Sequence, residues 1–160
     1  MGPYSLPTIT GLATGDHLCC LYETEEEHRA VLTPFLRSGL ERGEKVVYIV
    51  DLHPSKVILR YLQRDGLEVD SYLATGQLSF LNVDQTYMRG GVFNPNRMIN
   101  MLRAETKRAL AEGYSALRVT GEMSWALQRP PGFERLVQYE SKLGLFFPRN
   151  KCLGLCQYDR

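Results

Sequence analysis

The sequence lacks a long hydrophobic run, an excess of one charge and a recognisable leader. No apolar stretch approaches the roughly 20 residues of a membrane span, and the 160 residues carry a formal net charge of only +1. Because there is no polybasic block, we expect no direct binding to nucleic acid or to an anionic membrane. Residues 1–14 show no basic start followed by an apolar stretch, so we expect a cytoplasmic protein with reduced cysteines.

The turn after the first predicted strand lacks the residues of a phosphate loop. Such a loop needs glycines, whose backbone N–H groups wrap the anion, and a lysine that meets the terminal phosphates. Residues 22–28 read Tyr-Glu-Thr-Glu-Glu-Glu-His and contain neither residue type. The three glutamates already complement the positive end of the helix that starts here, so a triphosphate would meet like charge. We therefore expect no ATP hydrolysis, no bound cofactor and no enzymatic activity.

Short apolar runs alternate with helical patterns along the chain. Thr24 and Glu27 have the spacing of a capping box, which predicts a helix that continues to Gly43. Further helices are predicted from Pro54, from Asn94, with Met98, Ile99, Leu102 and Leu110 on its inner side, and over about 132–143. Strands are predicted at 17–22, 45–50, 77–83, 115–120 and 152–157. The alternation predicts one α/β domain, with a mostly parallel central sheet and helices on both faces.

Five stretches in a fixed order give the chain a family resemblance. They are Gly15-Asp-His-Leu-Cys-Cys-Leu-Tyr-Glu23, Gly39-Leu-Glu-Arg-Gly-Glu-Lys-Val-Val-Tyr48, Arg118-Val-Thr-Gly-Glu-Met-Ser-Trp125, Tyr139-Glu140 and Cys156-Gln-Tyr-Asp159. Together they resemble the MEDS domain, a methanogen and methylotroph sensory domain. We accordingly divide the chain into an N-terminal arm or linker at 1–14 and a MEDS-like sensory domain at 15–160.

The resemblance implies a RecA/KaiC-like three-layer sandwich whose phosphate loop has degenerated. It also implies signal transduction beside a partner such as a histidine kinase or a transcription regulator. Small hydrocarbon derivatives are the implied ligand class, because the family includes the sensory part of a dichloromethane-responsive repressor. Family members are expected to continue with another helix and strand after Arg160, so we expect a fragment truncated at its C-terminus or a short stand-alone member.

Ligands of parallel sheets bind outside the carboxyl ends of the strands. The polar residues that follow apolar runs are expected there: Tyr22, Glu23, Asp51, Glu122, Gln157, Tyr158 and Asp159. We predict a small-molecule pocket under a mobile Gly90–Gly91 loop, lined by Tyr22, Glu122, Trp125 and Tyr158, with His17 and Met123 as further candidates. Glu122 fits a ligand anchor or a structural ion pair equally well, and Met123 and Trp125 fit core packing better.

Three other functions compete with a ligand sensor. The inherited surface could serve only protein interaction or homo-oligomerisation, or Glu122 could retain residual catalytic activity. A thiol or metal redox sensor would use Cys19, Cys20, Cys152 and Cys156. However, Cys19 and Cys20 should point to opposite faces of a strand, and no pair has Cys-x-x-Cys spacing, so buried inert thiols are the expectation.

Overall fold

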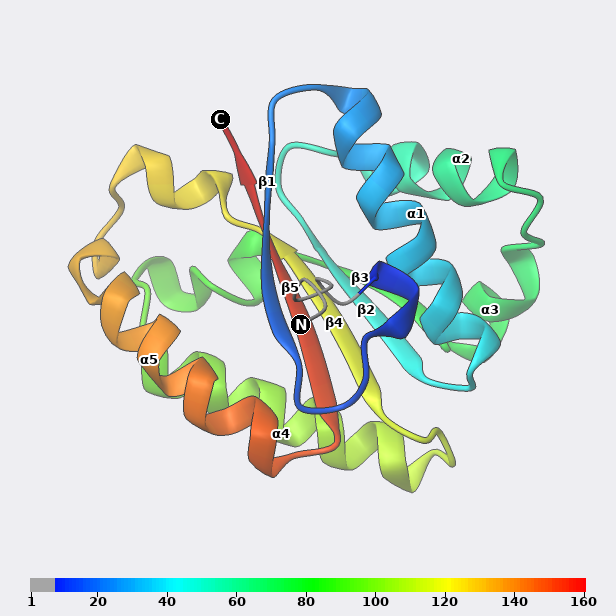
Figure 1. The fold of residues 1–160 in the computed structure, drawn as a ribbon. Coiled ribbons are helices and arrows are strands. Elements are labelled where there is room, and N and C mark those ends of the chain that lie inside the picture. Colours follow the sequence, from blue (N-terminus) through cyan, green and yellow to red (C-terminus); the bar gives the residue numbers. More distant parts are fainter. Residues whose placement is uncertain (1–7) are drawn as a thin grey trace, which may run out of the picture.

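The computed structural model describes residues 8–160, which form a single five-stranded parallel sheet with helices on both faces (Figure 1). The strands are β1 (His17–Tyr22), β2 (Lys45–Val50), β3 (Leu78–Asn82), β4 (Leu117–Glu122) and β5 (Cys152–Asp159). The α-helices are α1 (Glu25–Glu41), α2 (Ser55–Arg64), α3 (Asp70–Thr75), α4 (Pro95–Ala111) and α5 (Leu136–Phe146). This is the predicted fold class.

The start of α1 follows directly from the sequence. The Thr24 side chain accepts from the Glu27 backbone N–H at 3.2 Å, and the Glu27 carboxylate accepts from the Thr24 backbone N–H at 3.3 Å. This reciprocal capping box satisfies two of the N–H groups that every helix leaves unpaired at its start. The helix runs through Pro34 and ends before Gly43, whose φ of +74° lies in the left-handed region that glycine adopts without strain.

The strand order is β1-β5-β4-β2-β3, and all neighbours are parallel. The chain leaves β2 toward β3 at one edge of the sheet, whereas it leaves β4 toward β5 on the other side. The adjacent carboxyl ends of β2 and β4 therefore form the topological switch point, where open α/β sheets bind their ligands.

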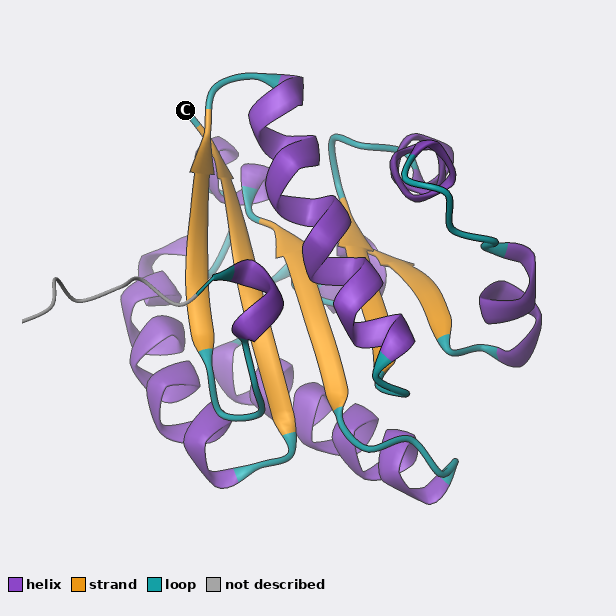
Figure 2. Ribbon diagram, turned by 45° about the vertical axis from the view of Figure 1, so that its right-hand side comes forward, coloured by secondary structure: helices purple, strands orange, loops and turns teal. Residues whose placement is uncertain are grey.

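Each face of the sheet has its own core. On one side α1, α2 and α3 cover an apolar cluster, while α4 and α5 cover a second cluster on the other side, as Figures 1 and 2 show. The first cluster contains Leu32, Phe35 and Tyr48, and the second contains Trp125 and Tyr139. Because both faces are covered, β2 and β4 consist almost entirely of buried residues.

Several predicted boundaries are displaced in the structure. The fourth strand was predicted at 115–120 but occupies Leu117–Glu122, so Glu122 is the last residue of the strand itself. The helix predicted at about 132–143 begins only at Leu136, after a 3₁₀ turn at Phe133–Arg135. Leu110 was expected to face inward but is 39% exposed.

The predicted N-terminal arm is only partly described, because residues 1–7 lie outside the described residues. Leu12 is buried in the core, and its carbonyl accepts from the Arg42 guanidinium at 2.7 Å. Residues 8–14 thus pack against the domain. Within 8–160 no helix is long and apolar enough to cross a membrane.

Candidate functional site

A cleft of about 480 Å³ opens at the switch point, beside the carboxyl ends of β2 and β3 and the 3₁₀ segment after β4. Its volume falls in the range of ordinary small-molecule sites, as do hollows of about 530 and 500 Å³ elsewhere on the surface, so its position at the switch point is what distinguishes it. The lining is mixed, with apolar and polar side chains in similar number: Val50, Asp51, Asn82, Val83, Asp84, Met88, Gly91, Trp125, Gln128 and Pro130. A second, apolar cavity beneath α4 and α5 measures only about 20 Å³, barely more than one water molecule needs.

Trp125 connects the cleft to the core. Its ring stacks on Tyr87 at 5.0 Å between centroids and lies 4.9 Å from the Phe93 ring. The buried indole N–H finds no hydrogen-bond partner within residues 8–160. An indole N–H usually acquires a partner when it is buried. Trp125 is therefore a cleft residue with an unused donor.

Glu122 lies on the other side of the same strand end and is almost completely buried. Its carboxylate accepts the Nδ1–H of His53 and the backbone N–H of Asp51, and the His53 backbone N–H lies 3.2 Å from both oxygens. The Tyr48 hydroxyl lies 3.1 Å from Oε1. The same hydroxyl lies 3.1 Å from the Gln157 carbonyl oxygen, and its single proton is shared between the two acceptors, so three N–H groups and part of a fourth donor occupy the roughly four acceptor positions of the carboxylate.

His53 bridges two carboxylates. Its Nδ1 meets Glu122, and its Nε2 lies 2.9 Å from Glu25 in the first turn of α1. Burial lowers the pKa of His53, but the hydrogen bonds to Glu122 and Glu25 outweigh it and raise the pKa to about 9. At neutral pH His53 is therefore a cation between two anions.

A second histidine, His28, stacks on His53 with ring centroids 4.1 Å apart and stays neutral, because burial lowers its pKa. Gln157 fixes its tautomer. The Gln157 amide donates to Thr120 at 2.8 Å, so its carbonyl oxygen faces His28 and accepts from Nε2–H at 2.6 Å. The Tyr61 hydroxyl lies 3.3 Å from Nδ1 and donates to Glu25 at 2.8 Å.

This buried network bears directly on chemistry at the strand end. In active RecA-like ATPases an acid at such a position holds Mg²⁺ or orients water, and both tasks need free oxygen lone pairs. Here three N–H groups already bond the Glu122 carboxylate, and the His53 side chain pairs with it.

The six predicted ligand residues do not form one pocket. Trp125 lines the cleft, whereas Met123 is buried in the same core and Glu122 lies in the network. Tyr22 packs on the His28 ring at 4.5 Å, on the opposite face of the sheet from Trp125. Near the β1 edge, Tyr158 donates to Glu140 at 2.8 Å, and His17 stacks on Phe147.

Sequence reasoning gave no role to His53 and His28, and it gave Glu25 only a place at the helix start. One signal could have found them: each lies in the first residues after β1 or β2, at the edge where the strand-end acids also meet. The Gly90–Gly91 loop lies at the cleft through Gly91. Of the four cysteines, Cys20 faces the α1 side and Cys152 is buried, while Cys19 and Cys156 face each other across β1 and β5.

Comparison with known proteins finds a relative in sequence and a solved structure of similar fold. The chain is 29% identical over 153 residues to the transcriptional repressor DcmR of Methylorubrum extorquens (strain DSM 6343 / CIP 106787 / DM4), covering 92% of this chain but about half (53%) of that repressor. The fold is similar to the crystal structure of the KaiC-like protein PH0186 from Pyrococcus horikoshii OT3, with a TM-score of 0.63 and 17% identity over 94% of this chain and 63% of that one.

The sequence profile of the MEDS family, described as the methanogen/methylotroph, DcmR sensory domain, matches residues 16–160. The match covers all the strands and α-helices of the fold. The chain belongs to the MEDS family of sensory domains.

Proposed function

We propose that this domain senses a small molecule in the cleft at the switch point and signals without hydrolysing ATP. The observation that carries the proposal is the contrast between two neighbouring parts of the carboxyl edge of the sheet. The buried network bonds the Glu122 carboxylate, whereas the neighbouring cleft keeps open volume and is lined by Trp125, whose buried N–H has no partner within residues 8–160.

The cleft lining supports a ligand of mixed character. Met88, Trp125 and Pro130 offer apolar surface, and Asp51 and Asp84 offer acceptors. Small-molecule sites combine an apolar wall with a few polar groups that fix orientation. A hydrocarbon derivative with one polar group matches this lining, and membership in a sensory family points the same way.

The output of the signal is proposed from the relative. DcmR is a transcriptional repressor, and this chain corresponds to about half of its length. We infer that residues 15–160 act as the sensing unit beside a transcription regulator or a histidine kinase. Ligand binding can drive such a partner only if it favours one conformation of the domain over another.

A ligand screen tests the proposal. Small halocarbons, alcohols and methylated amines are added to the protein, and binding is read by thermal shift and native mass spectrometry. A hit should lose roughly tenfold or more in affinity in Trp125→Phe, since one hydrogen bond contributes about 1.5 kcal/mol. Exposed Val137, which does not line the cleft, provides the control Val137→Ala, with unchanged binding. If no compound binds, or if Trp125→Phe binds every hit as well as the wild type, the proposal fails.

ATP turnover is the second arm of the test. Wild type and Glu122→Gln should show equal background rates with Mg²⁺ and ATP, because His53 and the backbone N–H groups of Asp51 and His53 already bond the Glu122 carboxylate. A rate above background that Glu122→Gln abolishes would instead establish a residual ATPase.

A protein-interaction module remains the second candidate, and surface leucine and valine residues favour it. Leu127 is 72% exposed in the segment after β4, and Val137 is 78% exposed at the start of α5. Light scattering would detect a defined homo-oligomer, and Leu127→Ser with Val137→Ser should dissociate it. If the protein is monomeric at all concentrations, homo-oligomerisation is excluded as the function of this domain on its own.

A further inference from the structure

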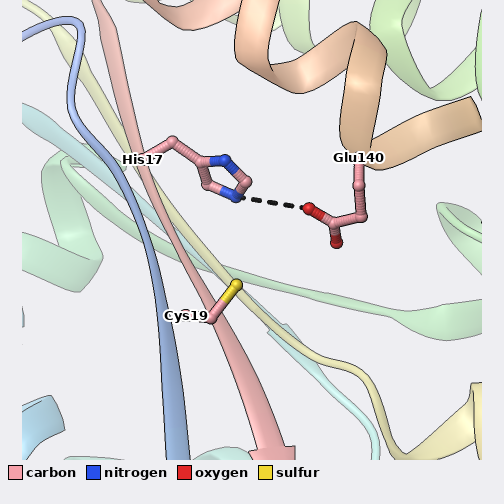
Figure 3. Close-up of side chains that lie close together, drawn as sticks. All are labelled: His17, Cys19 and Glu140. Atoms are coloured by element: carbon pink, nitrogen blue, oxygen red, sulfur yellow. Dashed lines mark ion pairs between the residues drawn. The ribbon is translucent and has the colours of Figure 1, made fainter. Parts of the chain in front are cut away.

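A second cluster of reactive side chains lies about the β1 edge of the sheet, away from the switch point. Figure 3 shows His17 and Cys19, both on β1, opposite Glu140 of α5. Cys156 of β5 completes the group, because it is the register partner of Cys19 in the parallel ladder. Three elements thus contribute an imidazole, two thiols and a carboxylate to one place.

The distances within the cluster are short. His17 Nε2 lies 3.5 Å from the Cys156 sulfur and 3.9 Å from a Glu140 oxygen. One ligand atom each from His17, Cys19 and Glu140 can be chosen so that all lie within 4.8 Å of one another. In a tetrahedral zinc site, metal–ligand bonds of about 2.0–2.3 Å set the ligand atoms roughly 3.3–3.8 Å apart. His17, Cys19 and Glu140 lie close to that geometry, and Cys156, which lies near His17, would complete it after changes of side-chain rotamer.

We propose that His17, Cys19, Glu140 and Cys156 bind one divalent transition-metal ion of the zinc class in tetrahedral geometry. Two sulfurs, one nitrogen and one oxygen form a donor set typical of zinc and unsuited to Mg²⁺ or Ca²⁺, which take oxygen ligands. The ion would cross-link the edge strand β1, its neighbour β5 and helix α5.

Neighbouring residues already orient the proposed ligands. The Tyr158 hydroxyl donates to Glu140 Oε1 at 2.8 Å, which leaves Oε2 directed to His17. Phe147 stacks on the His17 ring at 5.0 Å with an interplanar angle of 24° and holds its plane. Partners of this kind typically support the ligands of metal sites. Cys19 is exposed, so an ion can reach the cluster from solvent.

Cobalt titration of the full chain under a non-thiol reductant tests the site, because Co²⁺ replaces Zn²⁺ and reports thiolate ligation. We expect one Co²⁺ per chain, a near-ultraviolet thiolate-to-cobalt charge-transfer band, visible bands of tetrahedral cobalt, and displacement by Zn²⁺. Cys19→Ser and Cys156→Ser should each remove about half of the charge-transfer intensity and weaken binding by well over tenfold. Tyr158→Phe should weaken binding by roughly tenfold, as loss of a supporting partner does in other metal sites.

Cys20→Ser is the matched control, since Cys20 is the next residue of β1 but faces the opposite core. It should leave the cobalt spectrum and the affinity unchanged. Circular dichroism of each metal-free variant separates lost binding from lost folding, and the exposed position of Cys19 makes Cys19→Ser safe for the fold. Absence of 1:1 binding in the wild type, or an undiminished charge-transfer band in both Cys19→Ser and Cys156→Ser, would overturn the proposal. Neither outcome bears on the ligand screen, because the cleft contains none of these four residues.

Discussion

The pH dependence of stability should change in one direction when His53 is replaced by glutamine. The folded protein raises the pKa of His53 to about 9, whereas an unfolded histidine titrates near 6.5. Between these pH values the folded chain holds a proton that the unfolded chain has released. The free energy of unfolding therefore contains a contribution from His53 that is complete below pH 6.5 and disappears as the pH rises through 9.

The structure sets the magnitude of this contribution. A gap of roughly 2.5 pKa units corresponds to at most about 3 kcal/mol at 1.36 kcal/mol per unit. The His53 side chain is only 8% exposed, but the Glu25 side chain is 71% exposed, so solvent screens the part that comes from Glu25. The groups around His53 come from five elements: Glu122 of β4, Glu25 and His28 of α1, Tyr61 of α2, Tyr22 of β1 and Tyr48 of β2. We expect wild type to lose up to about 3 kcal/mol more between pH 6.5 and 9.5 than His53→Gln does.

Urea denaturation at the two pH values measures this difference. Cysteines and other groups also titrate in this range, but they do so in both proteins and cancel in the comparison. His28→Gln is the control. Burial lowers the pKa of His28, so any effect of His28 on the pH dependence of stability lies below pH 6.5, outside the range compared. Equal losses in wild type and His53→Gln would refute the view that His53 is a buried cation.

Three substitutions test the packing that positions the site. Thr24→Ala removes the cap of α1 and should cost about 1 kcal/mol in urea denaturation. Glu44→Leu leaves the Arg118 guanidinium, which is fully buried and bonded to Glu44 at 2.5 Å, without its counter-charge, and should cost about 3–5 kcal/mol. Gly132→Ala would set a Cβ 2.1 Å from the Phe93 carbonyl oxygen at a φ of +89°, so a loss of more than about 2 kcal/mol in thermal or urea denaturation is expected.

Each substitution has a matched control. Thr24→Ser keeps the capping oxygen and should be nearly neutral. Replacing Glu44 together with Arg118→Met should recover much of the lost stability, because no unpaired charge then remains. Gly113→Ala shares a left-handed φ of +95° but meets open space, so it should cost less than Gly132→Ala. Equal costs within any pair would contradict the assigned contact.

Local chemistry made much of the fold predictable. The capping box of Thr24, the buried run at 45–50 and the absent phosphate loop each depend on residues a few positions apart, and the first two appear in the structure as expected. Strand alternation also anticipated that Cys19 and Cys20 would face opposite sides.

Errors arose where a distant contact decides the conformation. Gly121 reads as the end of a strand, yet it continues β4, and it must be glycine because the Tyr87 hydroxyl occupies the space where a side chain would begin. Gly132, which precedes the late start of α5, likewise packs against the Phe93 backbone. Tyr87 and Phe93 are both distant in sequence from these glycines, so no local sequence pattern predicts the contacts.

The ionic network was hidden for the same reason. His53 and Glu122 are 69 positions apart, and nothing in either local segment marks them as partners. Strand-end logic predicted that Glu122 and Asp51 would meet at the carboxyl edge, and the Asp51 backbone N–H does bond the Glu122 carboxylate. Strand-end logic did not identify His53, the cation that offsets the cost of burying the Glu122 carboxylate.

Asp51 links the network to the cleft and so suggests how a signal could leave the site. Its backbone N–H donates to Glu122, while its side chain accepts from Ser124 at 2.5 Å and lines the cleft. A ligand that displaced Asp51 would therefore disturb the donors that hold Glu122 and, through His53, the contact to Glu25 on α1. Buried charge tolerates few intermediate arrangements, because an unpaired ion costs several kcal/mol. The contacts from Asp51 through Glu122 and His53 to Glu25 are therefore the route by which the proposed ligand would act on α1.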